Sequence, residues 1–419
     1  SMETPRSVTL AYHGDRVNPR PFVQVDVTHG GDASNLPTAY RLKVKKGAVD
    51  VTFLNGETTL RFTTSTATER LAGQFDAAAN GMSADSVYSI TIVVGAEYAA
   101  GVQEVTIATT LIVVNENDSP IAKGWTLAGV QRLYPTAAGA LITDGTGSAV
   151  YFFWNGSSYV TPAGDFTRLS ASGSGTGKSY TRAYPDSTKV TFNYLGRMTE
   201  IRDAFNNATT FLYDGSNRLW YITDPVGKFI TLTYDANGLD DVTDMMGRWT
   251  NVTVNSSRLL TAIADPDFVP TRFGYDASGR LDSITDRGGA TTTLGYHTTS
   301  GKLTSVTAPT VTLYTGQQAQ PATTLVPWQH VITPYTGTSG TPFAASRADT
   351  VRATVTDPGG HAVRFTVNSL GQPLQTTGPL GDTVTVTYNP SGQPLTVADR
   401  LGVSASYTYD GTGFPTVAT

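Results

Sequence analysis

Apolar and polar residues alternate strictly in several short segments of the C-terminal two thirds of the chain. In residues 229–234, Ile230, Leu232 and Tyr234 share one face, and two threonines lie between them. Residues 362–367 and 383–388 repeat the same alternation. Alternation over about six residues is typical of an antiparallel strand that is buried on one face only. These segments therefore predict half-buried β-strands.

The alternating segments recur with a period of about 21 residues. A tandem repeat of this length predicts one hairpin per unit and a continuous antiparallel sheet in which each unit mainly contacts its neighbours. A strip of more than about ten strands must coil, close or split. Val254 and Val367 replace the repeat tyrosine in two units. The tyrosines that mark the repeat are Tyr194, Tyr213, Tyr234, Tyr275, Tyr296, Tyr388 and Tyr409.

Each unit also contains two turn signals of the type Asp-x-x-Gly, as in residues 276–279 and 286–289. The Asp side chain can accept hydrogen bonds from the downstream backbone, and the Gly tolerates a positive φ. This turn role accounts for the recurring carboxylates, although a pair of them lining a groove stays an alternative. They are Asp203, Asp224, Asp244, Asp265, Asp286, Asp357 and Asp399.

The first strand of each unit is less regular than the second. Leu219 and Ile222 are three residues apart, as are Leu281 and Ile284. Residues three apart on a regular strand point to opposite faces, unless a β-bulge intervenes. We therefore expect either a strand covered on both faces or a kinked strand.

Residues 1–118 lack the repeat and contain about seven short strand-like runs separated by turn residues. This pattern predicts a β-sandwich of the immunoglobulin or cadherin type, followed by the strip over residues 119–419. The overall prediction is an all-β fold with little helix. An irregular excursion at about 308–350 is rich in Thr, Pro, Gly and Gln. We expect it to pack on the outer wall of the strip, with a flap over an opening, formed by Trp328 and Tyr335, as the alternative.

The unit YDASGRLDSITDRGG at residues 275–289 carries Gly279, Arg280 and Asp286 at its signature positions. It resembles the YD repeat of the Rhs family, which includes bacterial polymorphic toxins, insecticidal toxin complexes and teneurins. Residues 117–133, 141–153 and 180–197 resemble the entry segment and first strands of such proteins, so the resemblance covers about 119–419.

The resemblance implies a β-shell that spirals around a cavity, in a secreted or cell-surface bacterial protein. The implied partner is an encapsulated polypeptide cargo, or a cell-surface receptor or glycan. The Rhs-associated core of the family has no counterpart here, so its autoproteolytic residues have no equivalents. We expect an open or partly turned strip.

Composition narrows the functional classes. The formal charge is −5, and no basic run is present, which argues against a nucleic-acid partner. The chain has no cysteine, which removes disulfides, Cys-ligated zinc and thiol catalysis. The apolar runs fall far short of the about 20 residues that span a bilayer, so no membrane insertion is predicted. Ser1 before Met2, and a last repeat that stops at Thr419, suggest a fragment of a longer protein.

No catalytic, cofactor-binding or metal-binding residues are predicted. Residues 173–179 lack the glycine spacing of a phosphate-binding loop, and the five histidines lack metal-ligand spacing. Residues 115–120 are similar to the calcium-binding linker of cadherins, without the other ligand motifs. We therefore expect a non-enzymatic scaffold. The alternatives are a carbohydrate-binding or cell-adhesion module, with exposed aromatics gathered in one groove, and a β-helical polysaccharide-cleaving enzyme.

The junction between the two regions contains Asp118, Pro120 and Trp125. Pro120 biases the preceding residue toward an extended conformation. A short polar joint followed by an aromatic residue is unlike a flexible Gly/Ser tether. We expect the sandwich to pack against, or plug, one end of the strip.

Overall fold

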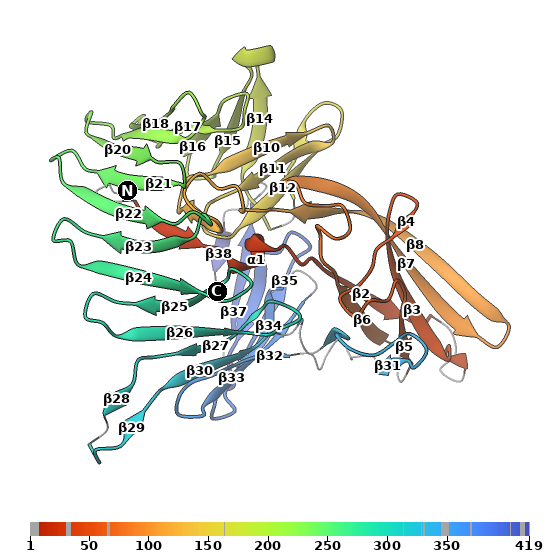
Figure 1. Cartoon of the computed structure of the whole chain (residues 1–419). Coiled ribbons are helices and arrows are strands. Elements are labelled where there is room, and N and C mark those ends of the chain that lie inside the picture. The colour runs from red at the N-terminus through yellow and green to blue at the C-terminus, as the bar shows by residue number, and fades with distance from the viewer. Residues whose placement is uncertain are drawn as a thin grey trace.

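The computed structural model describes residues 8–30, 35–64, 68–162, 164–312, 314–327, 329, 332–344, 352–368, 371–402, 404–410 and 415–418. Strands dominate, and α1 (Gly14–Val17) and a 3-10 turn at Gly175–Gly177 are examples of the few short helical segments (Figure 1). The all-β prediction is confirmed. In the described part of the chain, no helix is long and apolar enough to span a bilayer.

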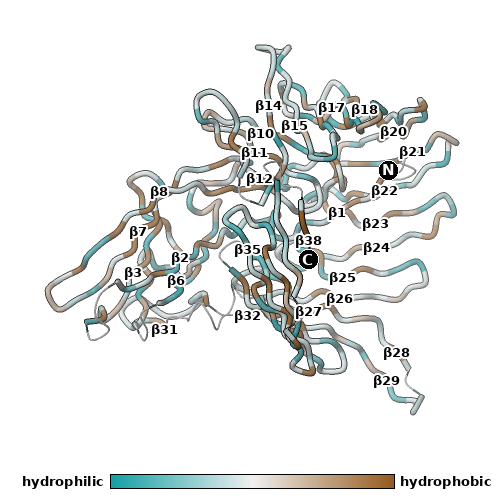
Figure 2. The backbone as a smooth tube through the Cα atoms, turned by 180° about the vertical axis from the view of Figure 1, so that it is seen from behind, coloured by the Kyte–Doolittle hydropathy of each residue, from teal (hydrophilic) through white to brown (hydrophobic). Residues whose placement is uncertain are grey.

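The repeat region forms a 22-stranded sheet, called the strip below, in which strands pair antiparallel with their neighbours along the chain. Apolar and polar residues alternate along these strands (Figure 2). The strands are β14 (Arg168–Ser172), β15 (Ser179–Ala183), β16 (Lys189–Phe192), β17 (Met198–Arg202), β18 (Ala208–Tyr213), β19 (Leu219–Thr223), β20 (Phe229–Tyr234), β21 (Leu239–Thr243), β22 (Trp249–Val254), β23 (Leu260–Ala264), β24 (Pro270–Tyr275), β25 (Leu281–Thr285), β26 (Thr291–Tyr296), β27 (Leu303–Thr307), β30 (Ala322–Val326), β32 (Arg352–Thr356), β33 (Ala362–Val367), β34 (Pro373–Thr377), β35 (Thr383–Tyr388), β36 (Pro394–Ala398), β37 (Ser404–Tyr409) and β38 (Pro415–Ala418).

A β-bulge at the start of the first strand explains the irregular spacing in each repeat. Tyr213 pairs with Leu219, whereas Leu212 pairs with Tyr221, so Trp220 is the extra residue. The same register shift recurs where Tyr234, Tyr275, Tyr296, Tyr388 and Tyr409 end their strands. The bulge returns Leu219 to the buried face that also holds Ile222. The first strand is therefore kinked.

The strip coils through one turn. It starts at β14, descends through β27 and returns behind these strands to β38 (Figure 1). The turn after β35 meets the loop before β14, where the Gly164 amide donates to the Ser391 carbonyl at 2.5 Å. Among the described strands, β14 and β38 remain the ends of the hydrogen-bonded path, so the coil is not a closed barrel.

A second, four-stranded sheet packs inside this coil. It contains β10 (Arg132–Thr136), β11 (Gly139–Thr143), β12 (Ala149–Trp154) and β13 (Tyr159–Val160). Beside it, β9 (Trp125–Leu127) pairs with β1 (Leu10–Tyr12) from the start of the chain. One hydrophobic core joins these elements to the inner face of the strip, and includes Leu133, Phe152, Phe192, Leu232 and Val252.

The N-terminal sandwich has two layers. One layer is β2 (Phe22–Thr28) with β6 (Thr68–Gln74). The other layer contains β3 (Ala39–Lys46), β4 (Val49–Asp50), β5 (Leu60–Thr63), β7 (Ser86–Tyr98) and β8 (Gly101–Val113). Val23 and Leu71 of the first layer share a core with Leu42, Phe62 and Ile92 of the second. The structure differs from the expected division in that β1 lies with the strip, because β1 completes its sheet with β9.

The excursion at 308–350 occupies neither expected position. Its first part forms a small hairpin, β28 (Val311–Thr312) with β29 (Gln318–Ala319), and β30 then rejoins the strip. Its second part packs on the sandwich, where β31 (Phe343–Ala344) pairs parallel with β5 and the Tyr335 hydroxyl donates to Gln74 Oε1 at 2.9 Å. The unpaired edge of β5 explains this position. Trp328 lies outside the described residues.

Candidate functional site

The repeat tyrosines form a hydrogen-bonded ladder on the inner face of the strip. Each hydroxyl donates to the carbonyl oxygen of the residue 15 positions earlier, which begins the first strand of the preceding unit. This bond ties two neighbouring hairpins together across the bulge. The pairs are Tyr213 with Met198 (2.9 Å), Tyr234 with Leu219 (2.8 Å), Tyr275 with Leu260 (2.8 Å), Tyr296 with Leu281 (2.7 Å), Tyr388 with Pro373 (3.0 Å) and Tyr409 with Pro394 (2.7 Å).

Tyr194 is not part of this ladder, which corrects the prediction. It lies in the turn after β16 and is 40% exposed. Phe192 occupies the ladder position instead, because it pairs with Met198 across the bulge and is fully buried. Asn193 takes the place of the repeat Asp, and its Oδ1 accepts from the amides of Leu195 and Arg197.

Arg280 and Arg218 stack on the ladder. The guanidinium of Arg280 lies 4.7 Å from the ring centre of Tyr296, and Arg218 lies 4.6 Å from that of Tyr234. Arg280 Nε donates to Asp276 Oδ2 at 2.8 Å, which fixes the guanidinium over the ring. Burial raises the pKa of Tyr296 to about 12, so its hydroxyl remains a protonated donor well into the alkaline range.

Most of the repeat carboxylates accept hydrogen bonds from turn amides, as predicted. Asp265 is an exception, because its Oδ2 accepts from Arg287 Nη1 at 3.0 Å instead. Asp224 Oδ1 accepts from the amides of Val226 and Lys228, and Asp286 Oδ1 accepts from the amides two and four residues onward. Gly279 has φ of +75°, a conformation that L side chains rarely adopt. In the described part of the chain, no group of three or more His, Asp or Glu side chains gathers as metal ligands would.

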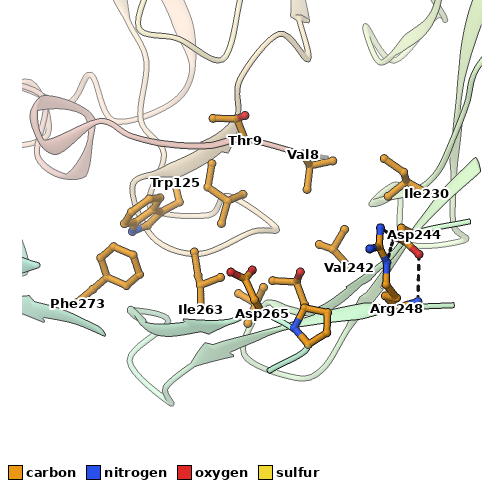
Figure 3. Close-up of a pocket in the computed structure, with 14 residues that line it drawn as sticks. Val8, Thr9, Trp125, Ile230, Val242, Asp244, Arg248, Ile263, Asp265 and Phe273 are labelled. Atoms are coloured by element: carbon orange, nitrogen blue, oxygen red, sulfur yellow. Dashed lines mark hydrogen bonds and ion pairs between the residues drawn. The ribbon is translucent and has the colours of Figure 1, made fainter. Parts of the chain in front are cut away.

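A half-open cavity of about 660 Å³ separates the N-terminal segment from the inner face of β20–β24 (Figure 3). The ion pair of Asp244 and Arg248, with Nε to Oδ2 at 2.8 Å, lies on one side of it. The apolar residues that line the cavity are Val8, Leu10, Trp125, Ile230, Val242, Val252, Ile263, Pro266 and Phe273.

Trp125 joins the N-terminal segment to the ladder. Its Nε1 donates to the Tyr275 hydroxyl at 2.9 Å, and its ring centre lies 5.2 Å from those of Tyr12 and Phe273. The Tyr12 hydroxyl in turn accepts from the Leu281 amide at 2.9 Å. The predicted junction residue is therefore the point at which β9, β1 and the strip meet.

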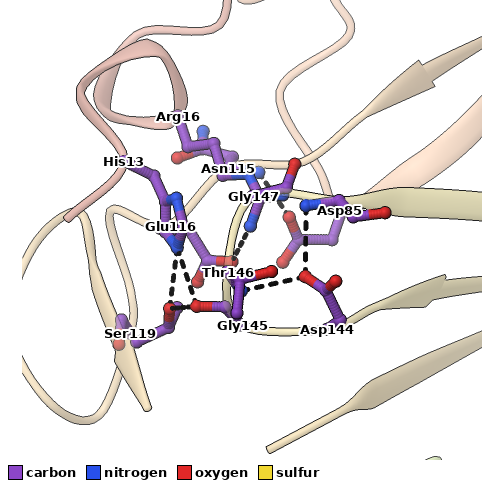
Figure 4. A network of polar contacts seen from close by, with 12 residues as sticks. His13, Arg16, Asp85, Asn115, Glu116, Ser119, Asp144, Gly145, Thr146 and Gly147 are labelled. Atoms are coloured by element: carbon purple, nitrogen blue, oxygen red, sulfur yellow. Dashed lines mark hydrogen bonds and ion pairs between the residues drawn. The ribbon is translucent and has the colours of Figure 1, made fainter. Parts of the chain in front are cut away.

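A buried polar cluster of Arg16, Asp85 and Glu116, called the joint below, connects the sandwich to the inner sheet (Figure 4). Arg16 Nη1 donates to Glu116 Oε1 at 3.3 Å, and both side chains are at most 10% exposed. Burial raises the pKa of Glu116 to about 7, against the opposing effect of the Arg16 charge. Burial also raises the pKa of the nearby Asp85. Glu116 belongs to the segment 115–120 that the sequence singled out as similar to a calcium-binding linker. Arg16 and Asp85 come from distant segments, so no local sequence signal connected them with Glu116.

The predicted junction residues Asp118 and Pro120 flank this joint. Asp118 is exposed, and its Oδ1 lies 3.9 Å from Arg258 Nη1 of the strip. Arg258 Nη2 also donates to the carbonyl of Ser119, the residue before Pro120. A turn of the strip thereby holds the extended chain that enters it.

Several aromatic side chains are exposed on the outer face of the strip, opposite the ladder. Trp220, Phe229 and Trp249 are 44–49% exposed. Tyr221 contacts two of them, with ring centres 4.2 Å from Trp220 and 5.7 Å from Phe229. Phe268 lies 5.9 Å from Trp249. These rings form an outer aromatic patch of two clusters, one around Tyr221 and one around Trp249.

No family model matches the chain. Among solved structures, it is similar to the TcdB2-TccC3 complex at 14% identity and a TM-score of 0.36, over 87% of this chain and 23% of that one. It is also similar to the Tc holotoxin pore of Photorhabdus luminescens carrying a TccC3 mutation, at 12% identity and a TM-score of 0.34, over 88% and 25% of the two chains. The chain thus spans about a quarter of the length of these proteins.

Proposed function

We propose that the chain is a non-enzymatic scaffold whose coiled strip forms part of a shell around a polypeptide cargo. The observation that carries this proposal is an apolar inner wall that continues past the inner sheet. On β33–β37, Phe365, Val386 and Tyr407 share the face of Tyr388 and Tyr409, yet they lie outside the hydrophobic core that the strip shares with the inner sheet. Val384 on the same face is 40% exposed.

The inner wall already holds one extended segment of polypeptide. Val8, Leu10 and Tyr12 pack against the core of the strip, and the chain there is extended in β1. An extended, partly apolar cargo segment would make the same kind of contact with β33–β37. A secreted or cell-surface bacterial location belongs to the same proposal, through the resemblance of the sequence to YD-repeat shells.

An unfolded model cargo tests the proposal. Fluorescently labelled, reduced and carboxymethylated α-lactalbumin should bind the protein and become protected from protease. Replacing Val384 and Val386 by Asp should weaken binding at least about ten-fold, which corresponds to about 1.4 kcal/mol. The matched control replaces Thr385 and Thr387 by Asp, on the outer face of the same strand, and should leave binding unchanged. Absence of binding, or equal loss in both variants, would contradict the proposal.

Glycan binding is the second candidate function, and the outer aromatic patch favours it. Exposed Trp220 and Trp249 offer flat faces of the kind that sugar rings stack on, and the hydrogen-bonded pair of Asn251 and Asp241 lies beside Trp249 on the same face. A glycan array should then show binding that Trp220→Ala and Trp249→Ala abolish. Tyr314→Ala, a fully exposed aromatic residue on the β28–β29 hairpin, is the control.

The polysaccharide-cleaving β-helix has no structural support. A β-helix stacks parallel strands, whereas the strands of the strip are antiparallel. Asp224 and Asp286, from the series of recurring carboxylates, accept hydrogen bonds from turn amides, as described above. We therefore propose the scaffold without a catalytic step.

A further inference from the structure

The sandwich ends in a long strand with an open edge. β7 and β8 form a hairpin of two 13-residue strands, with Ser86 paired to Val113 and Tyr98 paired to Gly101. β8 is the last strand of its sheet, and no described strand pairs with its other edge. Residues 101–110 are exposed on both faces, and the hairpin projects away from the rest of the molecule (Figure 1).

In an antiparallel ladder, hydrogen-bonded and non-hydrogen-bonded pairs alternate, so every second residue of β8 directs its amide and carbonyl away from β7. Proteins normally protect such an edge with charged side chains, above all Lys, or with Pro, a bulge or a short strand. β8 has no Lys, Pro or bulge and is 13 residues long, and Glu104 is its single charged residue. The edge is therefore free to add a strand.

The side chains of β8 also need a partner. Val105 pairs with Val94 and Ile107 with Ile92, so they extend the face that is buried in the sandwich core. Yet Val105 is 65% exposed and Ile107 is 41% exposed. The layer formed by β2 and β6 thus stops before it covers β8.

We propose that β8 is a dimerisation strand that pairs antiparallel with β8 of a second copy of this chain. A two-fold axis satisfies two open edges at once and continues the sheet across both copies. Glu104 would oppose an uncharged residue in every antiparallel register except the one in which it faces itself. β8 can therefore pair with a second β8 without a repulsive charge pair, and the partner then places its own Val105 and Ile107 beside the uncovered row.

Sedimentation and cysteine crosslinking of the full chain test this proposal. The chain has no cysteine, so each introduced thiol reports on one position. Among single cysteines at positions 102–110, only the one or two positions next to the two-fold axis should form intermolecular disulfides, because only there does a residue meet its own copy. Val49→Cys, 70% exposed on β4, should not crosslink.

In sedimentation, the wild-type protein should be dimeric at micromolar concentrations. The double variant Val105→Lys with Ile107→Lys should be monomeric, with dimer dissociation constants raised at least about 100-fold, whereas Val49→Lys should remain dimeric. Circular dichroism checks that the variants are folded. A monomeric wild-type protein, or a dimer that crosslinks only at Val49, would overturn the proposal. A monomer that instead binds an unrelated extended peptide at β8 would also overturn it, because the partner would not be a second copy.

Discussion

At the scale of the residue, one hydroxyl group explains why tyrosine marks the repeat. The phenol fills the inner face at the end of a strand, and its hydroxyl reaches the backbone carbonyl beyond the bulge. Phe192 and Val254 show that the apolar part suffices for packing, since both are buried without such a bond. The hydroxyl therefore contributes a hydrogen bond between neighbouring hairpins. The free energy that this bond contributes to folding depends on how deeply the bond is buried.

Replacing Tyr275 by Phe should destabilise the protein by about 2 kcal/mol, because the Leu260 carbonyl and the indole N–H of Trp125 both lose a partner in a buried site. Tyr388→Phe is the matched control. Its bond to Pro373 is exposed, so the loss should stay below about 1 kcal/mol. Urea denaturation of both variants measures the difference. Equal losses would show that burial does not set the strength of the ladder bonds.

Glu116 should make stability depend on pH. Its pKa rises from 4.5 to about 7 on folding, so the folded state binds the proton more tightly. This tighter binding stabilises the folded state by up to about 3 kcal/mol. The stabilisation is complete below about pH 4.5 and is lost as the pH rises to about 7. Arg16, Asp85 and Arg132 are the charged groups that act on it.

The stability of the wild-type protein should accordingly fall more between pH 5 and pH 8 than that of Glu116→Gln, as measured by urea denaturation. The substitution also leaves Arg16 without a counter-charge, but this cost is the same at both pH values. Glu200→Gln, which alters a partly exposed pair with Arg202, should keep the wild-type pH dependence. Parallel pH profiles for wild type and Glu116→Gln would assign the dependence to other groups.

At the scale of the element, the sequence predicts what is local and repeated. Tyr, Asp and Gly at fixed spacing predict the hairpins, and the three-residue spacing of Leu219 and Ile222 indicates the bulge. Pairings between distant segments leave no periodic signal: Leu10 pairs with Leu127, and Phe343 pairs with Phe62. Tyr194 does not hold the predicted ladder position, because two aromatic residues lie close together there. Phe192 ends the strand, and Tyr194 lies in the turn that follows it.

The turn glycines test whether the backbone conformation of a turn position decides which residues it accepts. Gly279 has φ of +75°, and Asn217 occupies the equivalent position in another repeat with φ of +60°. Asn tolerates this conformation far better than a β-branched residue does. Gly279→Asn should therefore cost less than about 0.5 kcal/mol, whereas Gly279→Val should cost more than about 1 kcal/mol. Thermal denaturation compares the two variants, and similar losses would mean that side-chain contacts, and not φ, set the cost.

At the scale of the whole molecule, the chain path ties the sandwich to the strip at both of its ends. The chain passes through β1 in the core of the strip, builds the sandwich, and returns through the joint to β9, which pairs with β1. The Glu116 amide donates to the Arg16 carbonyl at 3.1 Å where the two passages cross. The sandwich therefore cannot swing away from the strip without breaking the contacts of the joint, although the β1–β9 pair could stay intact.

Trp125 lies at the centre of this connection, so its removal should weaken the whole molecule. The side chain is 5% exposed and packs against Tyr12 and Phe273 beside the existing cavity. Trp125→Ala should cost about 3–5 kcal/mol, the usual loss for a buried aromatic residue. Because both ends of the sandwich are anchored there, calorimetry should show one coupled transition that moves to lower temperature in the variant. Trp154→Ala, at a 39% exposed position on the inner sheet, should shift it far less. A sandwich transition that is separate in the wild type and unchanged in Trp125→Ala would show that the two regions unfold independently, despite the shared strand pair.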